Sequence, residues 1–252
     1  MLILLQLKHL ESIISVSFVH PVRDEKGWRF DSNQSKYKDQ INGFNFLSEA
    51  YKMMDLKYNL RVTVPVLWDK KSKKIVNNES SDIIIMLNNN FNEFTESKLD
   101  FYPFKIRNEI DKVNKYIYDN INNGVYKCGF ATSQKVYNIE VYKLFNALNE
   151  IDLRLEGKKF IVGDSLTLSD IRLFVTLIRF DIVYFNHFKT NLKHIYDYKN
   201  LWQFVKMLYN HNEIKSTTKF EEIKDHYFKT HPYINPSGIV PIGPNIEDML
   251  KD

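Results

Sequence analysis

The spacing of hydrophobic residues divides the chain into a first part of mixed periodicity and a longer part of helical periodicity. The run LILLQLKHL at residues 2–10 has no cap or turn signal before it, which favours a helix entered part-way along. Residues 13–19, IISVSFV, are rich in β-branched side chains and end before Pro21, so they predict a strand. Residues 46–58 carry apolar side chains at helical spacing and predict a helix.

A proline divides the next extended segment. Residues 61–68, RVTVPVLW, predict a strand on each side of Pro65, and the polar turn at 69–74 leads to a hairpin return at 75–76. A proline between pairing strands lies mainly at a turn or an edge and is often cis. Such a proline leaves the backbone groups of Val64 exposed for pairing with an extended peptide ligand.

Helical periodicity dominates after a polar stretch at residues 88–103, which follows a short predicted helix beginning near Glu79. We therefore expect an α/β domain at residues 1–90, a linker at 91–104, an all-helical domain at 105–230 and an extended arm at 231–252. That arm contains four of the seven prolines. The helices predicted in the second domain cover residues 106–122, 133–155, 168–185, 201–211 and 218–229.

Composition excludes several classes of protein. The 252 residues are 44% hydrophobic with a formal net charge of +4, and the basic residues are interleaved with acids, which argues against a nucleic-acid partner. One cysteine cannot form an internal disulfide, and with no secretory signal this predicts a cytoplasmic protein. No apolar run reaches the roughly 18 residues of a membrane span. The His and Gly residues follow neither metal-ligand spacing nor a phosphate loop, so we expect no metal.

Candidate ligand-binding residues gather in the first part of the chain. Glu79 and Ser80 lie at a predicted helix start, where unpaired amides and the helix dipole attract an anion and Glu79 could hold an ammonium group. The alternative is simple helix capping. Trp28, after Gly27, could stack on a ligand or cover the domain edge. Arg61 could pair with a carboxylate or lie on the surface.

Thr167 and Asp170 match a capping box in which Asp replaces the usual Glu. The Thr167 hydroxyl would cap the helix, and Asp170 would reach back to the Thr167 amide. We therefore expect Asp170 to stabilise a helix start rather than to take part in catalysis.

Five segments together form a specific set of motifs. They are TVPVLWD at residues 63–69, NESS at 78–81, NNGVYKCGFA at 122–131, DIRLFVTLIRFD at 170–181, and the stretch 231–241, which contains HP and NPSGIVP. This set resembles the glutathionyl-hydroquinone reductases, the xi class of glutathione transferases. The resemblance extends from about residue 13 to residue 244.

The resemblance implies a thioredoxin-like α/β domain joined to an all-α glutathione-transferase domain, assembled as a homodimer. It also implies a glutathione site in the first domain. Val64 would pair its backbone with the cysteinyl group, while Glu79 and Ser80 would hold the γ-glutamyl end. Trp28 and Arg61 complete the implied site.

The same resemblance implies that Tyr126 and Tyr227 meet a quinone-type substrate and offer hydroxyls to its oxygens. Without it, two core tyrosines would be the preferred interpretation. With it, we expect both hydroxyls to face one cleft between the domains, near Trp28.

The family's nucleophile is a cysteine in a Cys-Pro-Trp-Ala-type motif at the start of the first helix, where the helix end lowers its pKa. The 252 residues contain no such motif. Residues 2–10 resemble the remainder of that helix, so we expect an incomplete thioredoxin-like domain without its first strand. Cys128 belongs to the helical-domain motif, and we expect a small buried group there rather than a nucleophile.

Two hypotheses follow for function. The first is a reductase of glutathionyl-hydroquinones that uses glutathione as co-substrate, with residues 1–252 inactive alone because the nucleophile lies upstream. The alternative is a non-catalytic module that keeps the fold for binding glutathione or a protein partner.

Overall fold

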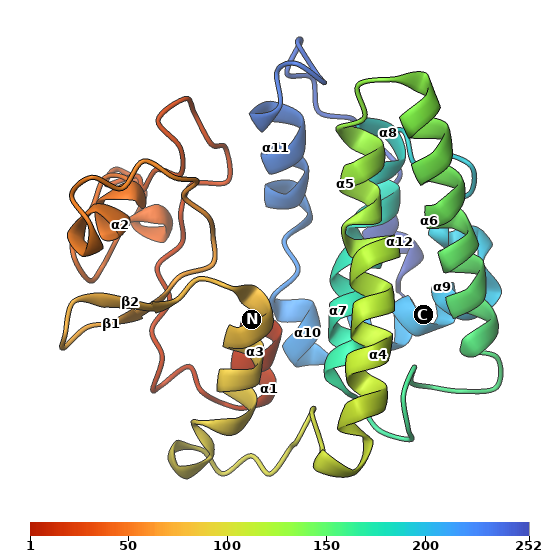
Figure 1. Cartoon of the computed structure of the whole chain (residues 1–252), viewed down its shortest axis with the longest axis horizontal. Coiled ribbons are helices and arrows are strands. Elements are labelled where there is room, and N and C mark those ends of the chain that lie inside the picture. The colour runs from red at the N-terminus through yellow and green to blue at the C-terminus, as the bar shows by residue number, and fades with distance from the viewer. Residues whose placement is uncertain (252) are drawn as a thin grey trace. The chain divides into compact units, whose positions relative to one another are not determined.

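The computed structural model describes residues 1–251, and the chain divides into two compact units, residues 1–98 and residues 99–252 (Figure 1). The first unit contains three α-helices and a small sheet, and the second consists of helices joined by turns and by two longer loops at residues 155–167 and 231–245.

Two helices of the first unit pack on each other. α1 (Leu2–Leu7) buries four of its six residues and contacts α3 (Ser80–Asn89), which buries Ile83, Ile84 and Leu87. Thr95 Oγ1 donates a hydrogen bond of 2.5 Å to the carbonyl of Lys8, the residue after α1. This bond ties the end of α1 to the segment that follows α3. The run 2–10 therefore begins with the expected helix.

The sheet of the first unit is a single antiparallel hairpin of β1 (Leu67–Asp69) and β2 (Lys74–Asn77). Asp69 closes its turn by accepting hydrogen bonds from the amide of Lys71 and the hydroxyl of Ser72. α2 (Ser48–Met54) packs against β2. The small core beneath consists of Leu47, Ala50 and Tyr51, with Trp28, Phe30 and Trp68 among the rings packed around it.

Two strand predictions for this unit are wrong. Residues 13–19 form no strand, and Ile13, Val16 and Phe18 stay exposed, because the hairpin is the only ladder within residues 1–251 and offers this segment no partner. In residues 61–68 only the part after Pro65 becomes a strand. The part before it is held by side chains instead, since the Tyr51 hydroxyl donates to the carbonyl of Thr63 at 2.9 Å.

The second unit is a helical bundle in which α5 packs on α6, α4 on α7, and α6 and α7 on α9 (Figure 1). Its α-helices are α4 (Arg107–Ile117), α5 (Gly124–Gly129), α6 (Gln134–Arg154), α7 (Leu168–Arg179), α8 (Phe185–His187), α9 (Lys199–Tyr209), α10 (Asn212–Ser216), α11 (Phe220–Thr230) and α12 (Ile246–Met249). Single 3-10 turns lie in the first unit at Ser35–Tyr37 and Asn92–Phe94, and in the second unit at Phe104–Ile106 and Ile195–Asp197.

All five helices predicted in this unit are present, and two of them change type before they end. α4 continues as a π-helical segment at Tyr118–Asn122, and α7 continues as another at Phe180–Tyr184. The sequence analysis did not anticipate α5, α10 or α12, which have six, five and four residues. Such lengths contain too few positions for a periodic pattern to be recognised. The arm predicted as extended throughout therefore contains one short helix.

The capping box at the start of α7 is confirmed. Asp170 is fully buried and accepts hydrogen bonds of 2.8 Å from the amides of Ile161 and Thr167 and from the Thr167 hydroxyl. Burial raises the pKa of this carboxyl, although the hydrogen bonds oppose the rise. These contacts are those of a residue that stabilises the start of a helix.

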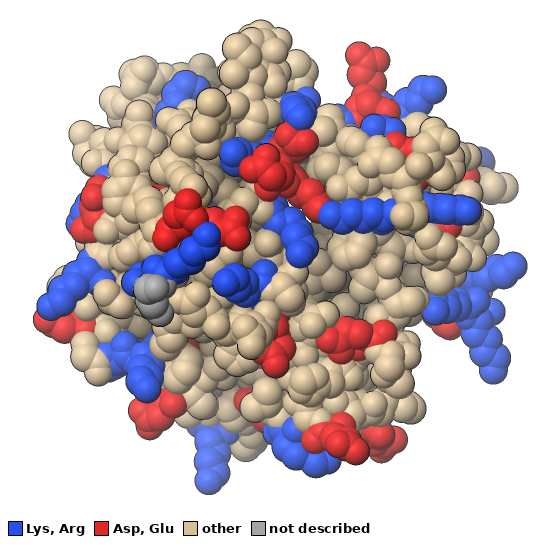
Figure 2. Space-filling view, turned by 180° about the vertical axis from the view of Figure 1, so that it is seen from behind, with Lys and Arg blue, Asp and Glu red and all other residues tan. Residues whose placement is uncertain are grey.

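Charged side chains are spread over the surface. On the face in Figure 2, blue Lys and Arg groups alternate with red Asp and Glu groups, and neither sign forms one continuous field. None of the helices within residues 1–251 combines the length and apolarity required to cross a membrane.

Candidate functional site

The peptide bond between Val64 and Pro65 is cis, and the Val64 residue is 41% exposed. Among residues 1–251, no hydrogen bond joins the Val64 backbone to another group. This segment therefore presents an open amide and carbonyl beside the hairpin, as an extended ligand requires.

Asn78 links that segment to the start of α3. Its Nδ2 donates to the Tyr51 hydroxyl at 3.1 Å and to Thr63 Oγ1 at 3.3 Å. The Tyr51 hydroxyl in turn donates to the Thr63 carbonyl. This three-residue network fixes the residue before Val64 relative to the residue before Glu79, so it holds two of the proposed binding elements together. The sequence analysis quoted Asn78 within a motif but assigned it no role.

Glu79 is the N-cap residue of α3, but its side chain makes no capping hydrogen bond. Its carbonyl accepts from the amides of Asp82 and Ile83, whereas the amides of Ser80 and Ser81 have no acceptor within the part of the chain that is described. The Glu79 and Ser80 side chains are both exposed. The N-terminus of this ten-residue helix has free amides and a hydroxyl without a hydrogen-bond partner among residues 1–251, so it can bind a carboxylate. Glu79 lies at the same end of the helix, where its carboxylate can bind an ammonium group.

Trp28 and Arg61 lie in the same unit in different settings. The Trp28 ring packs on the small core while part of it stays exposed, and the Arg23 guanidinium lies 5.9 Å from its centroid. Arg61 is exposed, and its carbonyl accepts from the Tyr58 hydroxyl at 3.0 Å. The guanidinium of Arg61 forms no ion pair among residues 1–251. It is thus available to an anionic ligand.

Three tyrosine hydroxyls meet in the helical unit. Tyr126 comes from α5, Tyr227 from α11 and Tyr184 from the π-helical end of α7. The Tyr126 and Tyr227 hydroxyl oxygens are 2.6 Å apart, and those of Tyr227 and Tyr184 are 2.9 Å apart. Tyr126 is 36% exposed and Tyr227 only 6%, so the residue at one end of this chain of hydroxyls is partly exposed and the next is buried.

Both π-helical segments adjoin these tyrosines. The segment Tyr118–Asn122 contacts α5, and the segment Phe180–Tyr184 contacts α11 and contains Tyr184 itself. A π-helical turn widens a helix and re-aims the side chains after it, and such turns are frequent at functional sites. The two helical irregularities of this unit therefore lie where the hydroxyls converge.

Aromatic rings surround the hydroxyls. Tyr184 stacks on Phe188 at 5.6 Å with an angle of 9° between the planes, and Tyr126 lies 5.4 Å from the same Phe188 ring. Burial first, and then the interaction with Tyr126, raises the pKa of Tyr227, while the Arg179 charge and the hydrogen bond with Tyr184 oppose the rise. Burial and the interactions with Tyr227 and Tyr126 raise the pKa of Tyr184, and the Arg179 charge opposes that rise. The phenols at these two positions consequently remain protonated.

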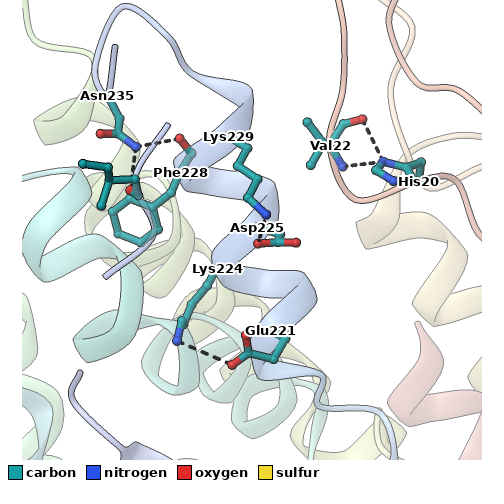
Figure 3. Close-up of polar contacts among 9 residues, drawn as sticks. His20, Val22, Glu221, Lys224, Asp225, Phe228, Lys229 and Asn235 are labelled. Carbon is teal, nitrogen blue, oxygen red and sulfur yellow. Dashed lines mark hydrogen bonds and ion pairs between the residues drawn. The ribbon is translucent and has the colours of Figure 1, made fainter. Parts of the chain in front are cut away.

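A buried histidine pair lies at the end of the helix that carries Tyr227. His187 Nε2 and His231 Nδ1 are 3.0 Å apart. Burial and then the His231 charge lower the pKa of His187 to about 4, so this ring is neutral at pH 7. Asn235 fixes the chain beyond His231, because its Nδ2 donates to the carbonyls of Phe228 and Ile239 at 2.7 and 2.9 Å (Figure 3).

Comparison with known proteins finds glutathione transferases for both units. The family model for the glutathione S-transferase N-terminal domain matches residues 1–90, and the model for the C-terminal domain matches residues 134–206. The glutathionyl-hydroquinone reductase PcpF of Sphingobium chlorophenolicum is 46% identical over 96% of this chain and 78% of PcpF. The chain belongs to the glutathionyl-hydroquinone reductases, the xi class of glutathione transferases.

Solved structures of xi-class transferases agree in fold. The glutathione-bound structure of YqjG from Escherichia coli has a TM-score of 0.94 and 45% identity, covering 96% of this chain and 79% of that one. The xi enzyme of Phanerochaete chrysosporium has a TM-score of 0.94 and 47% identity, covering 97% of this chain and 85% of that one. The fold class expected from the sequence, a thioredoxin-like domain followed by an all-helical transferase domain, is confirmed.

This enzyme family uses a cysteine thiolate as its nucleophile, so the state of Cys128, the one cysteine of the sequence, is relevant to activity. Cys128 is buried on α5, where burial and the Glu140 charge raise its pKa to about 12. A thiol with that pKa is almost fully protonated at neutral pH and is a poor nucleophile. No group of three His, Cys, Asp or Glu side chains within the described residues is arranged to hold a metal ion.

Proposed function

We propose that this chain has the binding sites of a glutathionyl-hydroquinone reductase, with glutathione bound by the first unit and the quinone-type substrate bound by the helical unit. The proposal for the aromatic substrate rests on the 2.6 Å contact between the hydroxyls of Tyr126 and Tyr227. These two residues are 101 positions apart in the sequence. Two core tyrosines would both be buried, whereas Tyr126 is partly exposed. A phenol at the surface with a second phenol hydrogen-bonded behind it suits an oxygen on an aromatic ring.

Glutathione would lie along residues 61–80. Val64 pairs its open backbone with the cysteinyl group, and the free amides of α3 take the γ-glutamyl carboxylate. Glu79 faces the γ-glutamyl ammonium, and the Ser80 hydroxyl adds a hydrogen bond. Trp28 covers the peptide, and Arg61 faces its remaining carboxylate. The glutathione-bound YqjG structure, which shares the fold, supports this proposal.

Tyr126 is the group we place against the quinone-type substrate. The expectation that both tyrosine hydroxyls are open to that substrate needs revision, because the structure buries Tyr227 behind Tyr126. Tyr227 therefore acts through Tyr126 and is a positioning residue.

The reaction itself needs a thiolate. A thiolate attacks the sulfur of the glutathionyl-hydroquinone, the carbon–sulfur bond breaks, and its electron pair goes to the ring carbon, which takes a proton. The resulting mixed disulfide with glutathione is resolved by a second glutathione, which forms glutathione disulfide and frees the thiolate. Cys128 does not suit this role, so we expect residues 1–252 alone to lack turnover. The same observation favours a second candidate, a non-catalytic glutathione-binding module.

Two further expectations rest on the family resemblance and the composition. We propose a homodimer, as is general in the xi class, and a reducing cytoplasmic setting, as suits a chain with one cysteine.

Calorimetry with glutathione tests the binding site. Glu79→Ala should weaken binding roughly 10- to 150-fold, because a hydrogen bond to a charged group typically contributes about 1.5–3 kcal/mol. Glu96→Ala, which removes another exposed carboxylate, outside the site, is the control and should bind as the unaltered chain does. Equal affinities in the two variants would remove Glu79 from the site. Reductase assays in which a thiolate is supplied from an upstream Cys motif then separate the enzyme from the binding module.

A further inference from the structure

Trp28 lies in the irregular segment between α1 and α2, and hydrogen bonds to the residues just before α2 hold its backbone. The amide of Leu47 donates to the Trp28 carbonyl at 2.9 Å, and the amide of Phe30 donates to the Asn45 carbonyl at 2.8 Å. The residues between these two pairs form an isolated antiparallel bridge. The position of Trp28 therefore depends on the position of residues 45–47.

One carboxylate fixes residues 45–47 in turn. Glu49, in the first turn of α2, reaches back so that its Oε1 accepts from the amides of Asn45 and Phe46 at 2.9 and 2.8 Å. The next amide, that of Leu47, donates to Trp28, so three consecutive amides each have an acceptor. A negative charge at the start of a helix is also favoured by the helix dipole. Glu49 thus links α2 to the segment that holds Trp28.

The Trp28 ring depends on the same segment. It packs on the small core of Leu47, Ala50 and Tyr51 and stays half-buried, while Leu47 is 7% exposed. Leu47 therefore contacts Trp28 twice, through its amide and through its side chain. A shift of this residue would move both the bond that holds the Trp28 backbone and the surface on which the ring packs.

We propose that Glu49 is a positioning residue for glutathione binding and acts through Trp28. This inference rests on the proposed function, in which Trp28 covers the bound peptide. Glu49 itself need not touch the ligand, because its carboxylate holds residues 45–47 and so orients the Trp28 ring before glutathione arrives. A ring that is already oriented loses less freedom on binding, which strengthens the complex.

Calorimetry with glutathione tests the link through a double-mutant cycle. Glu49→Ala should weaken binding roughly 3- to 10-fold in the unaltered chain but less than about 2-fold in Trp28→Leu, which has no indole ring to orient. Glu49→Gln keeps an oxygen that accepts two hydrogen bonds and should bind as the unaltered chain does. Asp55→Ala is the matched control, since it removes a carboxylate at the other end of α2 that accepts from the amide of Lys57, and it should leave the affinity unchanged.

Tryptophan fluorescence of the free chain gives a second readout, with Trp28→Leu used to subtract the emission of Trp68 and Trp202. The Trp28 emission should move to longer wavelength in Glu49→Ala, because a ring that leaves its core meets more water. It should not move in Glu49→Gln. Glu49→Asp keeps the charge but shortens the side chain, so it should resemble Glu49→Ala and serves where that variant does not fold.

Equal losses of affinity from Glu49→Ala in the two backgrounds would show that Glu49 does not act through Trp28 and would overturn the inference. So would a folded Glu49→Ala that binds glutathione and emits as the unaltered chain does. If Trp28→Leu alone leaves binding unchanged, Trp28 lies outside the site and the inference falls with it, while the comparison of Glu79→Ala with Glu96→Ala still decides the rest of the site. A chain that bound no glutathione would remove the proposed function, and the emission of Trp28 would then decide whether Glu49 positions the ring.

Discussion

A β-carbon placed on Gly129 would stand 2.1 Å from Cδ1 of the Phe188 ring. The backbone of α5 therefore lies directly against that ring. Phe188 stacks on Tyr184 and also packs against Tyr126 and Tyr227. Because Gly129 has no side chain, the Phe188 ring can pack against the backbone of α5 and contact all three tyrosines.

Gly129→Ala should destabilise the helical unit by about 1–3 kcal/mol, because Phe188 must move out of a close-packed aromatic layer. Thermal unfolding measures the effect, and near-ultraviolet circular dichroism should report the disturbed aromatic packing. Gly124→Ala is the control in the same helix, since its new β-carbon would meet Leu144 at an ordinary 3.4 Å. It should be neutral or slightly stabilising. A loss of stability equal in both variants would contradict the role given to Phe188.

Asp170→Ala should destabilise the chain by roughly 1–3 kcal/mol for each donor left without an acceptor. Two buried amides and one buried hydroxyl now point at this carboxyl. Asp197→Ala removes a carboxyl from the same position of an exposed capping box and should cost much less. Chemical denaturation compares the two. Similar losses in both would mean that burial of the Asp170 box contributes nothing extra.

Local sequence signals predicted the helical unit well and the first unit less well. Periodicity identified the long helices, and Thr167 with Asp170 identified a helix start, because each pattern is completed within a few residues. A strand needs a partner, and the β-branched run at 13–19 has none, so its composition alone was misleading. Helices of four to six residues left no pattern to detect.

Local motifs likewise identified some residues of the candidate site and missed others. The motifs led to Tyr126 and Tyr227 but not to Tyr184, which lies just beyond the quoted segment and 43 residues from Tyr227. Its position depends on a π-helical turn and on packing against the rings of Phe188 and Tyr227, neither of which a local pattern specifies. Asn78 was similarly visible as a letter in a motif, while its bonds to Tyr51 and Thr63 depend on the fold.

Cys128 should resist alkylation in the folded chain at about pH 8, because burial holds its thiol protonated with a pKa of about 12. Iodoacetamide labelling followed by mass spectrometry measures the rate, and the same chain in denaturant is the control and should react readily. Cys128→Ser should leave glutathione binding unchanged. Rapid labelling of the folded chain, together with a reductase activity that Cys128→Ser abolishes, would make Cys128 the nucleophile after all.

Acid should destabilise the chain in part through His187. Its pKa falls from an ordinary 6.5 to about 4 in the folded state, because of burial first and then the charges of His231, Lys189 and His226. Between these two pH values the unfolded chain binds a proton that the folded chain does not. The stabilisation is therefore complete above about pH 6.5 and is lost as the pH falls towards 4.

His187→Gln isolates this contribution, since the Gln amide can replace the hydrogen bond of Nε2 to His231 but cannot take a proton. The fall in melting temperature between about pH 7 and about pH 4.5 should be smaller in His187→Gln than in the unaltered chain. The buried carboxyls Asp170 and Asp181, whose pKa values are raised mainly by burial, titrate in both proteins and cancel in the comparison. His211→Gln changes an exposed histidine and should retain the full acid loss. If His187→Gln lost as much stability in acid as His211→Gln, protonation of the buried pair would not contribute to acid unfolding.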